Sequence, residues 1–395
     1  MASRADLELA KKLLGAGVLG EPALREALEI QQAYLEKGKT VTLERVLVAK
    51  GRLPAWAPKV IGAKSPLETQ PFEAYRLERA LGEGGSSTVY GGTYVPNRAR
   101  VAVKVLDPVH GLRQELVDRF EQEARLLIEI EHENVVTGYE VGVAEGLHYF
   151  SMDWIEGPTV LQMIDRAGRV ENQTALWITI QMAKALDYLH ARGLLHRDIK
   201  PGNVMIDASG RARLIDLGLV RRLEAKVAGA PAPAEEITTV GTVEYISPEQ
   251  ARGRGDLDVR TDVYSLGVTL YHMVVGDVPF HGETDYEVMA KHILSSLDSQ
   301  KVKQRRIDPA VHYAITKMMS KERDHRYASA AEVVKDLTRF LPAGGPPPIV
   351  LPVETPPGGV PGSLPPLSPT VLPRRAAVPR PGRPRDEHGP RRAER

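Results

Sequence analysis

The sequence is informative first through what it lacks. Its 395 residues include no cysteine, which excludes disulfide bonds, thiolate metal sites and a cysteine nucleophile. Lysine and arginine (52) nearly balance aspartate and glutamate (51), so bulk charge favours neither nucleic acid nor a membrane surface as a partner. No run of eighteen apolar residues occurs, and the first residues, MASRADLELAKKLLGAG, lack the apolar core of a signal peptide. We therefore expect a soluble cytoplasmic protein without a membrane span.

Residues 1–70 form a small, predicted helical region with an internal repeat. Two sets of residues at helical spacing correspond to one another: Leu9, Leu13, Leu14, Gly17 and Leu19, then Leu43, Leu47, Val48, Gly51 and Leu53. Each set predicts a helix that ends near its glycine. The arrangement resembles small helical modules at the N-termini of secretion ATPases and of some bacterial kinases. A regulatory or docking module with its own partner, and a helical extension packed on the next domain, both fit this region.

Residues 71–341 change from strand-like to helix-like sequence. The segments VYGGTYV, RVAVKVL and HYFSMDWI are rich in β-branched and aromatic residues and predict strands. From Glu171 onward, apolar residues recur at helical spacing, for example at Ile178, Met182, Ala185 and Leu189. We expect an α+β domain in which a β-rich lobe precedes an α-rich lobe.

Residues 342–395 have a different composition. Prolines occupy about three in ten positions, and arginines gather toward the end. Few groups there could offset the entropy of ordering, so we expect a disordered tail with polyproline II character. Its proline-rich segments could bind an SH3-like partner and its arginines an acidic surface, and an inert solvated tail remains the alternative.

The first motif with chemical content is the glycine-rich stretch LGEGGSSTV, from Leu81 to Val89. Glycines such as Gly82, Gly84 and Gly85 let backbone amides approach phosphate oxygens without a Cβ in the way. A dinucleotide-binding strand–turn–helix does not fit, because strand-like sequence follows. The motif G-x-x-x-x-G-K-[ST] is also absent, which excludes a P-loop.

A lysine and a glutamate follow at positions where they can meet. Lys104 ends the alternating stretch VAVK, fifteen residues after Val89. Glu123 lies beside the inward stripe of a predicted helix that contains Phe120 and Ala124. A carboxylate on a helix can hold the lysine against the α- and β-phosphates of a nucleotide. Taken alone, the two residues would more often be a surface pair.

The most specific segment is LHRDIKPGNV, residues 195–204, followed by LIDLG at residues 214–218. Asp198 can orient an incoming hydroxyl and accept its proton, and Lys200 can neutralise charge on the γ-phosphate. Asn203 offers an amide oxygen to Mg²⁺, and Asp216, thirteen residues later, offers a carboxylate. Each short motif alone could be an ordinary turn, but their order after Lys104 and Glu123 predicts phosphoryl transfer.

Residues 75–341 resemble the Hanks-type serine/threonine protein kinases of bacteria. The resemblance implies the two-lobed protein kinase fold and the use of ATP with Mg²⁺, or Mn²⁺ in its place, on protein substrates. It implies a hinge in which Met152 is the gatekeeper and the backbone of Asp153 and Ile155 bonds adenine. The implied nucleotide-binding residues are Leu81, Gly82, Gly84, Gly85, Val89, Ala102, Lys104, Met152, Asp153 and Ile155.

The resemblance extends to structural motifs of the second lobe. GTVEYISPE, residues 241–249, is similar to the end of an activation segment, and Arg326 matches the arginine that pairs with Glu249. Asp262 matches the aspartate that fixes the catalytic loop. The chain departs from the family pattern at the third glycine of the glycine-rich loop (Ser87), at the phenylalanine of Asp-Phe-Gly (Leu217) and at the alanine of Ala-Pro-Glu (Ser247). None of these changes removes a group that contacts phosphate or metal.

Serine/threonine specificity is implied by Lys200 and Thr242, both of which can reach Asp198, although dual specificity stays open. Arg197 often meets an activation-segment phosphate in this family, so we predict autophosphorylation at Thr238 or Thr239. Two other functions remain to be distinguished: a nucleotide-binding scaffold and a kinase of small molecules such as aminoglycosides or choline.

Overall fold

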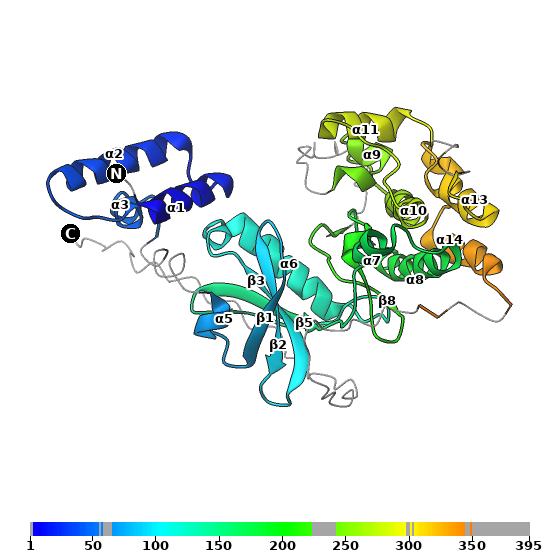
Figure 1. Ribbon diagram of the computed structural model, residues 1–395, viewed down its shortest axis with the longest axis horizontal. Helices are drawn as coiled ribbons and strands as arrows, with labels where there is room; N and C mark the ends of the chain where they lie inside the picture. Colours follow the sequence, from blue (N-terminus) through cyan, green and yellow to red (C-terminus); the bar gives the residue numbers. More distant parts are fainter. Residues whose placement is uncertain are drawn as a thin grey trace, which may run out of the picture.

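The computed structural model describes residues 3–54, 57, 65–222, 242–297, 301, 304–343 and 348–349. It consists of a group of N-terminal helices, a β-rich lobe and an α-rich lobe in chain order (Figure 1). The order of the two lobes confirms the α+β arrangement that the sequence predicts. Within the described residues, no helix combines the length and apolar character that a membrane span requires. Most of the tail predicted to be disordered, 342–395, lies outside the described residues, but Ile349 is buried against the α-rich lobe.

The N-terminal helices are α1 (Arg4–Gly15), α2 (Glu21–Glu36) and α3 (Leu43–Ala49). They share a core of their own, to which α1 and α3 contribute Leu13 and Leu47, both fully buried. Asp6 and Gln31 are buried polar residues of this region, and the Asp6 carboxylate accepts hydrogen bonds from the Gln31 side chain and the Leu43 backbone, both at 3.0 Å. The carboxylate therefore joins all three helices.

The internal repeat predicted from the sequence is confirmed by the backbone. Gly17 and Gly51 have φ angles of +62° and +64°, in the left-handed region that glycine tolerates best. Both follow the same helix-ending pattern, in which a backbone N–H donates back to a leucine carbonyl: Val18 to Leu13 at 2.9 Å and Arg52 to Leu47 at 2.8 Å. The two halves of the region thus end their helices with equivalent turns.

The β-rich lobe is one antiparallel sheet with the strand order β1-β2-β3-β5-β4. The strands are β1 (Tyr75–Glu83), β2 (Ser87–Tyr94), β3 (Ala99–Leu106), β4 (Gly138–Ala144) and β5 (Leu147–Asp153), preceded by α5 (Pro66–Thr69). Helix α6 (Gln114–Glu129) packs on the sheet through its apolar stripe (Figure 1), and the rings of Phe120 and Phe150 lie 5.0 Å apart. This packing places Glu123 within hydrogen-bond distance of Lys104 of β3.

The α-rich lobe is built around two helices that are buried on nearly all sides, α8 (Asn172–His190) and α10 (Arg260–Val275). The other helices are α7 (Val160–Ala167), α9 (Pro248–Ala251), α11 (Asp285–Leu294), α13 (Pro309–Met318) and α14 (Ala330–Leu337). The short strands are β6 (Leu194–Leu195), β7 (Val204–Ile206), β8 (Ala212–Leu214) and β9 (Arg221–Arg222), and the 3₁₀ turns are η1 (His110–Leu112), η2 (Pro201–Asn203), η3 (Val243–Tyr245), η4 (Arg323–His325) and η5 (Thr338–Phe340).

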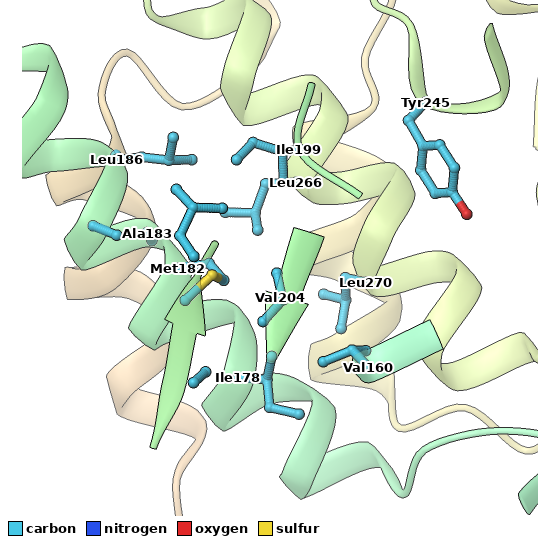
Figure 2. Packing of buried hydrophobic residues seen from close by; sticks show 14 of the residues in the cluster. Val160, Ile178, Met182, Ala183, Leu186, Ile199, Val204, Tyr245, Leu266 and Leu270 are labelled. Atoms are coloured by element: carbon cyan, nitrogen blue, oxygen red, sulfur yellow. The ribbon is translucent and has the colours of Figure 1, made fainter. Parts of the chain in front are cut away.

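The core of this lobe also supports the loop that carries Asp198. Figure 2 shows Met182 of α8 and Leu266 of α10 packed around Ile199 and Val204, which flank the loop. Both loop residues are fully buried. Since interiors pack as densely as organic crystals, the loop has little freedom to shift relative to α8 and α10. The fold therefore presents Asp198 from a rigid base.

Candidate active site

Lys104 and Glu123 meet between the sheet and α6. The Lys104 ammonium lies 2.7 and 2.9 Å from the two carboxylate oxygens of Glu123, and both side chains are largely buried. In the sheet, Lys104 is paired with Val89 of β2 on one side and with Phe150 of β5 on the other. The pairing that the sequence predicts is present, and it is a bidentate buried ion pair.

Asp216 adds a second carboxylate to this pair, with its Oδ1 3.8 Å from the Lys104 nitrogen. Burial raises the pKa of Glu123 to about 7, and the negative charge of Asp216 adds to the rise while Lys104 opposes it. Burial alone would lower the pKa of Lys104, but attraction to the two carboxylates outweighs it and the pKa is raised. Two carboxylates around one ammonium leave an excess of negative charge that a divalent cation could neutralise.

The loop after β6 brings Asp198, Lys200 and Asn203 into contact. The Lys200 ammonium donates to the Asp198 carboxylate at 2.7 Å and to the Thr242 hydroxyl at 2.8 Å. The Asn203 amide nitrogen donates to the Asp198 backbone carbonyl at 2.9 Å and to its carboxylate at 3.0 Å. Thr242 reaches Asp198 through the Lys200 ammonium. These bonds fix the Asp198 carboxylate and engage Asn203 through its amide nitrogen, so that its amide oxygen takes no part in them.

Asp262 of α10 holds the loop from below. Its buried carboxylate accepts backbone N–H bonds from His196 at 2.9 Å and from Arg197 at 2.7 Å, and a bond from the His190 ring at 2.8 Å. Burial would raise the pKa of Asp262, but these donors outweigh it and hold the pKa below its usual value. Arg197 has a φ angle of +67°, a strained value for a non-glycine residue, and the Asp262 bonds stabilise it.

His196 links the Asp198 loop to the segment of Asp216. Its Nδ1 accepts from the Asp198 backbone N–H at 3.2 Å, so its Nε2–H donates to the Asp216 carbonyl at 2.7 Å. The β7–β8 hairpin makes a second link, because the Ile215 N–H donates to the Asn203 carbonyl at 3.0 Å. Asn203 and Asp216 therefore lie at the same end of one hairpin.

A carboxylate and an amide oxygen are hard ligands of the kind that Mg²⁺ prefers. Burial would raise the pKa of Asp216, but Lys104 and the Gly218 N–H outweigh it and hold the pKa below its usual value. Asp216 is thus an anion at neutral pH. In the described part of the chain, no group of three or more His, Asp or Glu side chains is placed to hold a metal. A cation between Asn203 and Asp216 would need further oxygens, which nucleotide phosphates and water can supply.

Most of the predicted nucleotide-binding residues lie on strands β1, β2, β3 and β5 or in the turn between β1 and β2. In the glycine-rich turn between β1 and β2, the Gly84 N–H donates to the Ser87 carbonyl at 2.8 Å, while Gly82 pairs with Val89. Ala102 of β3 pairs with Met152 of β5, and both are buried. Leu81 is largely exposed. The remaining predicted residues of this set are Gly85, in the same turn, and Ile155, which packs on the main core after β5.

The Asp153 side chain and Trp154 have roles that the sequence did not indicate. The Asp153 carboxylate pairs with Arg213 of β8 at 2.7 Å and its backbone N–H donates to the Thr137 carbonyl at 2.9 Å, so only its own carbonyl is left for a base. The Trp154 ring lies under the Arg100 guanidinium at 3.9 Å and so close to Gly91 that a Cβ there would approach to 2.6 Å. Both contacts join residues distant in sequence, so no local pattern reveals them.

Glu249 and Arg326 form the buried pair that the resemblance implies. The guanidinium makes two bonds to the carboxylate, at 2.7 and 2.9 Å, and both side chains are almost fully buried. The pKa of Glu249 lies below its usual value because the Arg326 bonds and charge outweigh burial. The predicted phosphorylation sites Thr238 and Thr239 lie outside the described residues.

Residues 75–337 match the family model described as a protein kinase domain. A probable serine/threonine-protein kinase of Clostridium perfringens is 35% identical over 266 residues, which is 67% of this chain and 38% of its own length. Serine/threonine-protein kinase PrkC of Bacillus subtilis is 31% identical over 67% of this chain and 40% of its own length. Serine/threonine-protein kinase PknB of Mycobacterium leprae is 32% identical over 70% and 44%. The match therefore spans less than half the length of each of these relatives.

Proposed function

We propose, since this chain belongs to the protein kinase domain family, that it transfers the γ-phosphate of ATP to serine and threonine hydroxyls of protein substrates. One observation carries the proposal: the loop that holds Asp198 and Asn203 is hydrogen-bonded to the segment of Asp216, and Asp216 faces the Lys104–Glu123 pair. These contacts support the proposal that Lys104, Glu123, Asp198, Asn203 and Asp216 act on one nucleotide. The family implies ATP, and Mg²⁺, with Mn²⁺ as a substitute, is our assignment for the cation.

In this proposal each residue has a distinct role. Lys104, held by Glu123, binds the α- and β-phosphates, while Asn203 and Asp216 hold the cation, which neutralises the phosphate charge. Asp198 accepts the proton of the acceptor hydroxyl as its oxygen bonds to the γ-phosphorus, and the bond from that phosphorus to the β-phosphate oxygen breaks, releasing ADP. Lys200 neutralises the charge carried by the transferred group.

The preference for a short alcohol rests on the Lys200 bridge. Because the Lys200 ammonium is bonded to both Asp198 and Thr242, the end of the activation segment closes over the base. This arrangement favours serine and threonine, whose hydroxyls lie close to the backbone. The segment from Thr242 to Glu249 also supports a polypeptide substrate rather than a small molecule such as choline or an aminoglycoside.

The test is transfer of γ-labelled phosphate from ATP to the protein itself and to a generic protein acceptor. We expect labelled phosphoserine and phosphothreonine with the wild type and a loss on the order of 10²- to 10⁴-fold with Asp198→Asn. ATP affinity, measured on the same samples, controls for folding. Retained ATP binding without transfer in the wild type would support a nucleotide-binding scaffold instead. Transfer only to a small molecule would contradict the protein-kinase assignment.

We also propose that phosphorylation of Thr238 or Thr239 orders the activation segment. Three arginines lie close enough to influence one another beside this segment: besides burial, the charges of Arg221 and Arg119 lower the pKa of Arg197, while Asp262 opposes the shift. A phosphate would be attracted to such a group of arginines. Arg119 lies on α6, so a phosphate bound there would also contact the helix of Glu123. Replacing both threonines with alanine should lower the transfer rate, and an unchanged rate would contradict the proposal.

Further assignments follow the same division of the chain. We propose that residues 71–341 are the catalytic domain, that residues 1–70 are a regulatory or docking module and that residues 342–395 bind an SH3-like or acidic partner. We place the protein in the cytoplasm, where ATP and protein substrates are available. A pull-down compares the tail alone with a version in which its arginines are replaced by glutamine. It tests whether the tail binds its partner through its positive charge or through its prolines.

A further inference from the structure

The N-terminal helices, residues 3–54 (the module), are in contact with the loop that precedes α6. Val109 is buried in the core of the module, and Leu112 packs against the same core. The Arg113 guanidinium donates to the Ala16 carbonyl at 3.0 Å. The contact therefore combines apolar burial with a charged donor, and it joins positions 97 residues apart.

The loop residue Arg113 is also the point at which α6 begins. Its carbonyl accepts the first helical hydrogen bonds, from Leu116 at 3.0 Å and Val117 at 3.1 Å, yet no side chain in the described part of the chain caps this end of the helix. A helix end without a cap is weakened. Glu123 lies ten residues further along, about 15 Å by the helical rise, so tilting this end moves the glutamate. The module thus supports the otherwise uncapped end of the helix that carries Glu123.

The same loop is tied to the glycine-rich turn. The Asp107 N–H donates to the Ser86 carbonyl at 2.9 Å, and the Asp107 carboxylate accepts from the Val109 N–H at 2.8 Å. One end of the loop therefore touches the turn that faces the phosphates, and the other end starts α6. The module, which is docked on this loop, is therefore connected to the glycine-rich turn and to α6.

The repeat within the module shows how specific the contact is. Arg113 contacts the turn at Gly17, where an added Cβ would lie 3.0 Å from its guanidinium nitrogen. At the equivalent Gly51, an added Cβ would meet no atom of the described residues within 4 Å. The two turns have the same backbone geometry, so the chain supplies a built-in control for the docked one.

We propose that the module is a positioning element for catalysis: docked through Val109, Leu112 and Arg113, it holds α6 where Glu123 pairs with Lys104. This inference rests on the proposed kinase function, and Arg113 is a positioning residue within it. The competing explanation is that the module only adds stability to the fold. The two differ in whether the effect passes through Glu123.

The first test compares full-length Arg113→Ala and Arg113→Lys with Arg125→Ala. Arg125 lies on the same helix and pairs with Glu121, one turn away on that helix. We expect Arg113→Ala to lower kcat/KM for ATP about three- to thirty-fold and to leave KM for the protein acceptor unchanged. Arg113→Lys should restore part of the loss because lysine can still donate to the Ala16 carbonyl, and Arg125→Ala should match the wild type. An unchanged or increased kcat/KM for Arg113→Ala overturns the proposal.

The second test uses the two equivalent glycines. Gly17→Ala and Gly51→Ala impose the same backbone strain, but only the former crowds Arg113. We expect a larger loss of kcat/KM for ATP with Gly17→Ala at a similar melting temperature. Equal losses would show that the module acts through stability alone and overturn the proposal.

The third test asks whether the effect passes through Glu123. In a Glu123→Gln background, Arg113→Ala should cause little further loss of the residual activity, whereas multiplication of the two losses contradicts the mechanism. Hydrogen exchange of residues 114–129 gives a readout without turnover, and Arg113→Ala should accelerate it. A wild type that transfers no phosphate while α6 exchange still responds would refute the kinase function but not the docking. Unchanged exchange overturns the docking itself.

Discussion

The charged side chains that this protein buries have partners that satisfy them. Lys104 and Glu123 meet between sheet and helix, Glu249 and Arg326 meet under α9, and Asp262 accepts two backbone N–H bonds. A buried ion pair contributes little compared with an apolar pair of the same volume, but removal of one partner leaves an unpaired charge. Such pairs fix the relative positions of the segments they join more than they increase the free energy of unfolding.

Arg326→Met should therefore lower the free energy of unfolding by about 3–5 kcal/mol. Glu249, 2% exposed in its side chain, would lose two bonds and keep one from Thr261 at 3.0 Å. The double variant Arg326→Met/Glu249→Leu should be more stable than Arg326→Met alone, because no charge is then left unpaired. Urea unfolding of the three proteins provides the measurement. A double variant less stable than the single one contradicts this explanation.

At the residue scale, the sequence predicts the site best where spacing is short. Asp198, Lys200 and Asn203 share one loop, so their contact follows from sequence order alone. The pairs Lys104–Glu123 and Glu249–Arg326 were predicted from a helical stripe and from a resemblance, and both are present. The Asp153–Arg213 pair was not predicted, because nothing in either segment indicates that β5 and β8 approach each other.

At the scale of elements, α11 is joined to the end of the activation segment through one buried histidine. His292 accepts from the Tyr264 hydroxyl at 2.9 Å and donates through Nε2 to the Glu244 carbonyl at 3.0 Å. Burial, reinforced by the charge of Lys321, lowers the pKa of His292 to about 3. The neutral ring is thus the form that holds α11 against the turn η3.

This shift predicts a pH dependence of stability. The folded pKa is below that of the unfolded chain, about 6.5, so the unfolded chain binds more protons between these values and stability is lost as pH falls below 6.5. Between pH 7 and pH 5 the wild type should lose about 2 kcal/mol more than His292→Gln. Urea unfolding of both proteins at the two pH values measures the difference. Parallel losses would show that His292 is not buried in its neutral form.

For the elements themselves, hydrophobic periodicity predicted α1, α3 and α8, and the repeat glycines predicted where α1 and α3 end. The strand-like segments became β2, β3 and β5 because β-branched residues suit a sheet. The pairing order β1-β2-β3-β5-β4 could not be predicted, since it depends on which strands bury their apolar faces together.

At the scale of the whole molecule, one apolar core runs through both lobes. It includes Ala102 of β3 and Met152 of β5 as well as Leu266 and Leu270 of α10. The module has a separate core and meets the rest at the loop before α6. That contact could not be predicted from the sequence, because Arg113 and Ala16 are far apart and neither belongs to a motif.

Ligand binding between the lobes should stabilise the whole molecule. At a concentration one hundred times its Kd, Mg-ATP should raise the free energy of unfolding by about 2.7 kcal/mol. Removing the metal with EDTA should reduce this gain because the cation is then absent. Replacing Asp216 with asparagine should reduce it because the cation loses a carboxylate ligand. Thermal unfolding with and without nucleotide measures the effect. An equal gain with and without metal would contradict the assignment of Asn203 and Asp216.

In the proposed function, five side chains act on one metal-bound triphosphate: Lys104, Glu123, Asp198, Asn203 and Asp216. The most direct measurement is the rate of γ-phosphate transfer at saturating ATP as Mg²⁺ is titrated, for the wild type and Asp216→Asn. We predict that transfer by the wild type depends on Mg²⁺. The rate of Asp216→Asn should be lower by at least a factor on the order of 10² at every Mg²⁺ concentration. Equal rates for the two proteins, or no transfer by the wild type with Mg²⁺ present, would contradict the proposed function.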